Sequence, residues 1–345
     1  MKKTLLSLLF ALLCANMQAQ DAHFTQHYAT PTYITPAMTG IFDGRIRGTV
    51  AYRSQWSSFL ATPFNTFAAT FDVRVPIGNK ADNHFVGGGL DFYSDKLGGA
   101  SYTSTDAMSI SGAYHRSLDA RGDNTLSAGL RIGFAQRSIN YEGLFFQDQF
   151  DASNNNFGNP NLENLPRNSI TYTDLSTGLF WSTNPEKRTQ YHAGLGLYHI
   201  NRPSVALFQT KNSEAVLGLR TVVIVGAQFE TSPRVDLIPR MVVMTQSGTW
   251  EANIGTNVRI GLDDYNDNSI YVGSWVRPVS EPSGKINMDA IVLMTGVQAG
   301  QIRVGASYDI NVSPLISVSK TVGAFEISVQ YVGNYGEDKV MCPTF

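Results

Sequence analysis

Charged residues are scarce in this chain, and that scarcity narrows the possible classes of protein. Only 16% of the residues are charged, whereas a typical soluble domain has about 25%. The formal net charge is −2, and no basic stripe interleaved with aromatics is present. Because affinity for nucleic acid depends mainly on positive charge, we expect no nucleic-acid partner.

Cysteine is nearly absent. Cys14 falls in the leader described below, so Cys342 is the single cysteine of the mature chain and no intramolecular disulfide is possible. Catalytic signatures are also lacking: there is no Gly-x-Ser-x-Gly elbow and no glycine-rich phosphate loop. The six histidines show no metal-ligand spacing with carboxylates or cysteines. A Ser and a His facing one another across the fold stay open as a catalytic pair, but nothing singles out one Ser. We predict no enzymatic activity and no cofactor.

Long apolar runs are confined to the start of the chain. The run Leu5–Leu13 follows Lys2 and Lys3 and precedes small and polar residues, which is the pattern of a secretory signal peptide. We assign residues 1–20 to it, with cleavage at Ala19 or Gln20. The run is shorter than the roughly 20 residues of a membrane helix, and no other stretch approaches that length. If the mature protein lies in a membrane, it crosses as strands.

Alternation of apolar and polar residues is what the chain has in abundance. Between Gln301 and Val312, apolar residues such as Ile302 and Val304 occupy one face of an extended strand, and polar residues such as Arg303 and Asp309 occupy the other. Similar stretches recur from Gly44 onward and give about 14 strands. An even number of strands is typical of single-chain outer-membrane barrels, although a soluble sandwich also has alternating strands.

The lengths of the connections favour the barrel over the sandwich. The two long ones, residues 140–168 and 202–216, both follow odd-numbered strands, whereas short turns rich in Asn, Asp, Gly or Pro follow the even-numbered strands. Barrels have short periplasmic turns and longer external loops. This arrangement therefore predicts an integral outer-membrane protein with both termini in the periplasm.

The predicted fold is all-β: a transmembrane, antiparallel, up-and-down β-barrel over residues 44–335 with a periplasmic tail at 336–345. Residues 21–43 form an N-terminal arm with two prolines, many aromatics and no strand or helix period, which we expect to pack in or under the lumen. Residues of both charges are predicted to face the lumen, which indicates that salt bridges brace a filled barrel. They are Arg45, Arg47, Arg53, Arg74, Arg131, Arg137, Arg259 and Arg303 with Asp72, Asp91, Asp174, Asp289, Asp309 and Glu326.

A series of short motifs runs in order along the chain. Its first members are Gln20-Asp-Ala-His-Phe-Thr-Gln-His-Tyr28, Pro31-Thr-Tyr-Ile-Thr-Pro-Ala-Met-Thr-Gly40 and Tyr52-Arg-Ser-Gln-Trp56, and its later members are Tyr198-His-Ile-Asn-Arg-Pro203, Gly273-Ser-Trp-Val-Arg277 and Cys342-Pro-Thr-Phe345. This series resembles the PorP/SprF family of the type IX secretion system. Thr35 departs from the Asn that is usual before the second proline of the arm.

The resemblance implies a non-enzymatic outer-membrane barrel of the secretion and gliding-motility machinery. Its partners would be type IX secretion components in the periplasm or outer membrane, outer-membrane lipid, and a secreted cargo protein. The family helps to export its cargo or attach it to the cell surface through the cargo's C-terminal sorting domain. The alternative is a channel or transporter for a small or lipidic solute, which would need an open pore or apolar tunnel.

Two groups of residues are candidates for these roles. Residues in the two long connections, or just before the second one, are candidates for partner binding: Phe145, Phe146, Phe150, Phe157, His199, Asn201 and Pro203. Residues of the arm and first hairpin are candidates for a plug in the lumen: Phe24, Gln26, Tyr28, Tyr33, Pro36, Arg53 and Trp56.

Overall fold

The computed structural model describes residues 21–333 except 22, 59, 61, 78–83, 99–102, 142–143, 152–153, 155–156, 158, 164, 166, 187, 208–214, 264–267, 282, 315 and 317–320. The predicted signal peptide (1–20), the predicted tail (336–345) and Cys342 lie outside the described residues. In the part described, no helix is long and apolar enough to span a membrane.

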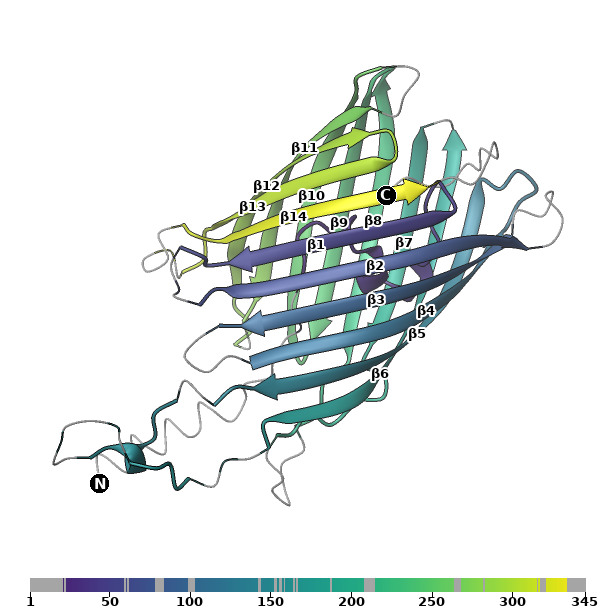
Figure 1. The fold of residues 1–345 in the computed structure, drawn as a ribbon. Coiled ribbons are helices and arrows are strands. Elements are labelled where there is room, and N and C mark those ends of the chain that lie inside the picture. Colours follow the sequence, from purple (N-terminus) through teal and green to yellow (C-terminus); the bar gives the residue numbers. More distant parts are fainter. Residues whose placement is uncertain are drawn as a thin grey trace.

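Fourteen antiparallel strands close into a single barrel, as predicted (Figure 1). Each strand pairs with the next along the chain, and β1 pairs with β14 to close the ring. The strands are β1 (Ile46–Gln55), β2 (Phe64–Ile77), β3 (His84–Leu97), β4 (Thr103–Ser117), β5 (Asn124–Ile139), β6 (Ser169–Glu186), β7 (Thr189–Tyr198), β8 (Arg220–Ser232), β9 (Val235–Gln246), β10 (Thr249–Gly261), β11 (Ser269–Ser280), β12 (Ile286–Ala299), β13 (Ile302–Asn311) and β14 (Ala324–Gly333). The described residues also form three short 3₁₀ helices that are not part of the wall: η1 (Pro31–Tyr33), η2 (Pro36–Met38) and η3 (Gln147–Gln149).

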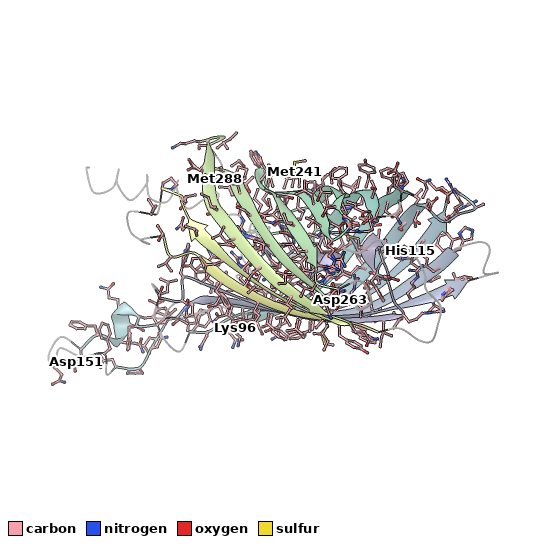
Figure 2. All side chains as sticks on the ribbon, turned by 90° about the horizontal axis from the view of Figure 1, so that it is seen from above. Lys96, His115, Asp151, Met241, Asp263 and Met288 are labelled. Carbon is pink, nitrogen blue, oxygen red and sulfur yellow. The ribbon has the colours of Figure 1, made fainter. Side chains whose placement is uncertain are left out.

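The two faces of the wall have opposite chemistry. In β4, Met108 and Ile110 are each 67% exposed on the outside, whereas Ser109 and Ser111 are buried inside. A soluble protein would reverse this arrangement, but a barrel in lipid requires it. The outward face carries a continuous apolar surface that includes Leu90, Phe92, Met108, Ile110, Leu130, Ile132, Phe134, Leu179, Met241, Val272, Met288 and Leu293 (Figure 2).

The barrel has two distinct rims. We call the rim where odd-numbered strands end the loop rim, since it carries the long connections 140–168 and 199–219, and the opposite one the turn rim. The connection between β5 and β6, with η3 and Asp151, extends beyond the loop rim (Figures 1 and 2). One connection at the loop rim is short: Ser247 and Gly248 form a two-residue turn with φ of 54° and 83°. Positive φ at both positions is what a tight antiparallel hairpin needs.

Replacing Ile110 with Arg tests the assignment of the outer face to lipid. Ile110 lies in the middle of β4 and faces Leu90 and Ile132 on the neighbouring strands. A charge at the bilayer midplane costs about 2–4 kcal/mol in barrels, so we expect the free energy of unfolding in lipid vesicles, measured with urea, to fall by that amount. Leu162→Arg, in the β5–β6 connection, is the control and should change it by less than about 0.5 kcal/mol. Equal losses in the two variants would contradict the assignment.

Candidate functional site: the arm in the lumen

The arm runs through the lumen from one rim to the other (Figure 1). At the loop rim, the Asp21 backbone N–H donates to Oε1 of Gln246, the last residue of β9, at 3.0 Å. At the turn rim, the Arg45 N–H donates to the carbonyl of Gly333, the last residue of β14, at 2.8 Å. Asp21 and Gly333 therefore lie at opposite rims.

Two prolines shape the middle of the arm. Pro31 and Pro36 each begin a 3₁₀ helix, where a missing N–H leaves no hydrogen bond unmade. The Thr35 hydroxyl accepts from the Ala37 N–H at 3.3 Å and caps the second turn. The arm thus forms compact turns in place of a strand.

Apolar packing and close approach hold these turns against the wall. Ile34, Ala37, Met38 and Ile41 of the arm share one buried cluster with wall residues Phe85, Phe180, Tyr198, Val222, Ile224, Val242 and Met244. A Cβ at Gly129 of β5 would lie 2.5 Å from the Pro36 carbonyl oxygen, and one at Gly87 of β3 would lie 2.0 Å from that of Thr39. Glycine at these positions lets the backbone of the arm touch the backbone of the wall.

Buried carboxylates of the wall bind the first half of the arm. The two oxygens of Glu326 accept from the backbone N–H groups of Thr25 and Gln26, each at 2.8 Å. Arg53 lies beside Glu326 at 3.4 Å and beside Asp309 at 2.9 Å, and Arg277 reaches Asp309 at 2.8 Å. We call these residues, Arg53, Arg277, Asp309 and Glu326, the acid-arginine cluster. Its members are at least 96% buried, so removing one charge would leave another without compensation.

A second carboxylate holds the other end of the arm. Asp72 accepts from Arg47 at 2.6 and 2.9 Å and from the Gly40 N–H at 2.7 Å. Arg47 also donates to the carbonyls of Met38 and Ile41 at 3.3 and 3.1 Å. The arm is therefore bound to the wall near both rims.

At the loop rim, His199 connects the arm to the wall through two acids. Its Nε2 lies 2.6 Å from Oδ2 of Asp21, and its Nδ1 lies 2.8 Å from Oδ1 of Asp174. Burial opposes a charge on the imidazole, but the two carboxylates outweigh it and raise the pKa of His199 to about 9. Arg220 also lies near Asp21, at 3.5 Å. Ionic contacts thus fix the start of the arm at this rim.

The residues predicted to form a plug have the following surroundings. Phe24 is buried among Ala51, Ala68, Tyr33 and Tyr93, and Gln26 is fully buried. Tyr28 donates to Oε1 of Gln26, and Tyr33 donates to the Phe92 carbonyl. Trp56 differs from the others. Its ring packs on Phe64, and its backbone N–H donates to the Gly323 carbonyl at the loop rim. Trp56 therefore belongs to the rim, since the alternation that turns Arg53 inward ends with the strand at Gln55.

The residues predicted to bind a partner fall into two groups. In the β5–β6 connection, the rings of Phe145 and Phe150 each pack on Phe157 at centroid distances of 5.1 and 5.3 Å. These three side chains, the aromatic cluster, stay 71%, 41% and 51% exposed in the order Phe145, Phe150, Phe157. Phe146 precedes η3, and its N–H donates to Oε1 of Gln149.

The second group has internal partners. Asn201 donates to the Thr173 carbonyl and accepts from the Leu175 N–H, and the Pro203 carbonyl accepts from the Leu217 N–H. His199 is buried between its two acids. The direct role of these three residues in the structure is to order the start of the β7–β8 connection.

Sequence reasoning did not single out several residues of the arm contacts. Thr25 bonds to Glu326, Asp309, Arg53 and Arg277. Arg277 was visible only as the end of a motif, and Thr25 as one polar residue in an irregular segment. No local signal identifies them, because the contact between Thr25 and Glu326 joins residues 301 positions apart.

Comparison with known proteins agrees with a membrane barrel. The structure is similar to two mutants of the TodX monoaromatic hydrocarbon channel. The ΔS2 mutant has 10% sequence identity and a TM-score of 0.52, and the match covers 88% of this chain and 93% of that one. The ΔS2S3 mutant has 9% sequence identity and a TM-score of 0.51, and the match covers 90% of this chain and 93% of that one. BamA of Haemophilus ducreyi lacking POTRA domains 1–3 gives 11% identity, a TM-score of 0.47 and coverage of 84% and 70%. At these identities the similarity concerns the fold alone. No curated protein sequence matches.

The closed antiparallel wall, the apolar outer face and the polar lumen define an outer-membrane β-barrel. A family model, described as type IX secretion system membrane protein PorP/SprF, matches residues 16–331. The chain belongs to the PorP/SprF family, as its motifs indicated.

Arg53→Met tests the acid-arginine cluster. Among the described residues, the substitution leaves Glu326 without its guanidinium neighbour and leaves Asp309 with one guanidinium neighbour of two. Breaking a buried ion pair from one side costs about 3–5 kcal/mol, and we expect a loss of that size in urea unfolding in vesicles. Arg121→Met, which removes an exposed pair with Asp123, is the control and should change little. A loss below about 1 kcal/mol for Arg53→Met would show that the cluster does not hold the arm.

His199 makes stability depend on pH in a defined window. Its folded pKa of about 9 lies above its ordinary value of 6.5, so its contribution is fully present below pH 6.5 and is lost as the pH rises through 9. With about 1.4 kcal/mol per pKa unit, the loss is roughly 3 kcal/mol. We expect the free energy of unfolding to fall by that amount between pH 6 and pH 9.5, and His199→Gln to abolish most of the decrease. An unchanged pH profile in the variant would contradict this assignment.

Proposed function

We propose that the protein is a non-enzymatic barrel of the type IX machinery that holds a secreted cargo protein by its C-terminal sorting domain for export or attachment to the cell surface. The arm closes the lumen, and the aromatic cluster of the β5–β6 connection contacts the cargo. The loop rim faces the cell exterior, and the turn rim faces the periplasm, where other secretion components bind.

The observation that carries this proposal is the exposed aromatic cluster. Three phenylalanines that pack on one another in a connection extending past the rim leave a large apolar area in water. Monomeric proteins rarely expose such groups without a partner, and aromatic residues supply much of the energy of protein interfaces. Neighbouring polar groups, such as Asp148 and Asn154, supply the polar rim that an interface needs.

The arm supports a binding role over a transport role. It contacts strands on several sides of the lumen, and Ala37, Thr35 and Gln26 have no exposed surface. A channel would need a solute path through the lumen. An arm that is bonded near both rims stands in that path. The runner-up function, transport of a small or lipidic solute, therefore has less support.

The test is affinity purification of the tagged full-length protein from detergent-solubilised outer membranes, followed by mass spectrometry. We expect wild type to recover a secreted protein in stoichiometric amount. Substituting Ser at Phe145, Phe150 and Phe157 together should reduce the recovery at least tenfold, because the apolar contact is lost, while the barrel still folds.

The matched control is Leu118→Ser, which removes an exposed apolar side chain at the turn rim. It should leave the recovery of cargo unchanged. If wild type copurifies with no secreted protein, or the triple variant recovers as much as wild type, the proposed contact is wrong. Folding of each variant is checked by heat-modifiable migration on gels.

A further inference from the structure

One buried arginine of the lumen, Arg240, differs from three others. Arg47, Arg53 and Arg277 each pair with a buried carboxylate. Arg240 of β9 is 8% exposed, and its Nε is buried without a hydrogen-bond partner. It makes no ion pair with any residue in the described ranges. An unpaired buried guanidinium is costly, so an anion from outside the chain is the natural partner to look for.

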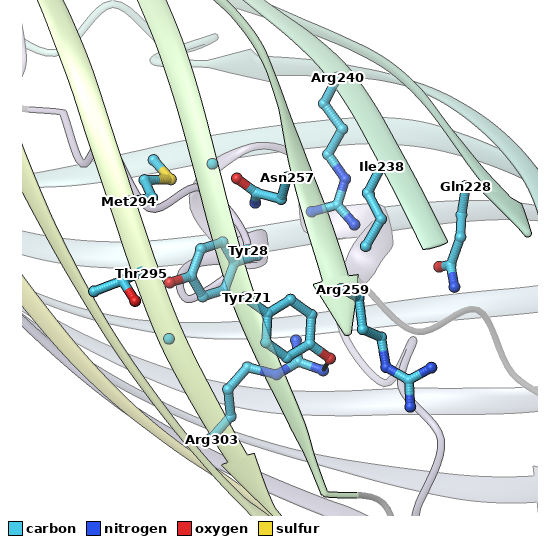
Figure 3. A pocket seen from close by; sticks show the side chains of 12 residues that line it. Tyr28, Gln228, Ile238, Arg240, Asn257, Arg259, Tyr271, Met294, Thr295 and Arg303 are labelled. Atoms are coloured by element: carbon cyan, nitrogen blue, oxygen red, sulfur yellow. Dashed lines mark hydrogen bonds between the residues drawn. The ribbon is translucent and has the colours of Figure 1, made fainter. Parts of the chain in front are cut away.

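Arg240 lines a pocket on the turn-rim side of the arm (Figure 3). The pocket has a cavity volume of about 30 Å³, and about 520 Å³ of empty space when the solvent at its opening is included. Tyr28 of the arm forms part of its wall, and Arg240 also borders the space beneath Thr25, His27 and Met38. The guanidinium thus lies between the arm and this pocket.

The wall is shaped to leave the Arg240 side chain in this position. Gly226 of β8 is its partner across the strands, and a Cβ there would lie 2.8 Å from Cγ of Arg240. The same Cβ would lie 2.5 Å from Nε2 of His192, so any other residue at position 226 would push both the His192 ring and the arginine stem aside. The strand pairing therefore fixes the guanidinium at the edge of the pocket.

Other groups of the pocket make it positive. Arg259 donates to Asp236 at 3.0 Å, and Arg303 donates to Gln298 and to the Tyr271 hydroxyl at 2.8 and 3.0 Å. Three arginines line the pocket. Asp236 balances the charge of Arg259, and no carboxylate is among the pocket's lining residues in the described part of the chain. Ile238 and Met294 supply apolar walls. Concentrated positive charge in a low-dielectric cavity attracts small anions.

We propose that this Arg240 pocket binds a small oxyanion, a phosphate or carboxylate group. Arg240 would donate two parallel hydrogen bonds to its oxygens, which is the favoured geometry between a guanidinium and either group. The amide of Asn257 lies in the same lining and can donate a further bond. The anion either is free in solution or belongs to a lipid headgroup, since both present the same oxygens.

The experiment uses the full-length protein purified in detergent, with inorganic phosphate as the probe and sodium chloride holding the ionic strength constant. We expect phosphate to raise the midpoint of thermal unfolding of wild type. Arg240→Gln should weaken the apparent affinity for phosphate at least tenfold, and Arg240→Lys should weaken it less because the charge remains. Arg121→Gln, which removes an exposed charge outside the lumen, is the control and should keep the wild-type response to phosphate.

A second experiment distinguishes the two sources of the anion. Wild type is compared in bicelles of phosphatidylglycerol and of phosphatidylcholine, both in buffer without inorganic phosphate. A response to phosphate that depends on Arg240 supports a free oxyanion, and a response only to phosphatidylglycerol that depends on Arg240 supports a lipid phosphate. Absence of both responses in wild type, or equal responses in wild type and Arg240→Gln, would overturn the proposal.

Discussion

The structure depends on buried carboxylates of the wall accepting hydrogen bonds from the backbone of the arm. Glu326 binds two successive backbone N–H groups, and Asp72 binds a third near the other rim. A carboxylate in this environment is tolerated only if its charge is balanced, and Arg53 and Arg47 provide that balance. The arm, the acids and the arginines are therefore one unit, because the removal of any one would leave the others with unsatisfied groups.

This unit explains how a barrel of this size can be filled. Small barrels are filled by their own side chains, and large ones leave a channel, so fourteen strands are an intermediate case. Here the arm supplies the missing volume, and glycines such as Gly87 and Gly129 let it approach the wall. The outer face is free to be apolar, since polar groups are concentrated inward. Filling the lumen leaves the rims as the surfaces available for partners.

The fold was predictable because its signal is local. The alternation of Ile302 and Val304 with Arg303 and Asp309 requires only neighbouring residues, and it gave the strands, their faces and the closed barrel. The arm contacts were less accessible, because they join residues hundreds of positions apart and the arm has no period. Aromatic richness marked the arm and the β5–β6 connection, but no sequence pattern distinguishes a paired arginine such as Arg277 from an unpaired one such as Arg240. Pairing depends on the register between distant strands.

Hydrogen bonds from backbone N–H groups of the arm to wall carboxylates keep the lumen closed. Single-channel conductance of the full-length protein in planar bilayers tests it most directly, with wild type compared to Glu326→Gln combined with Asp72→Asn, which weakens acceptance at both ends of the arm. We expect no steady conductance for wild type and discrete openings for the double variant. Steady conductance of wild type, or a double variant as silent as wild type although folded, would contradict this role of the hydrogen bonds.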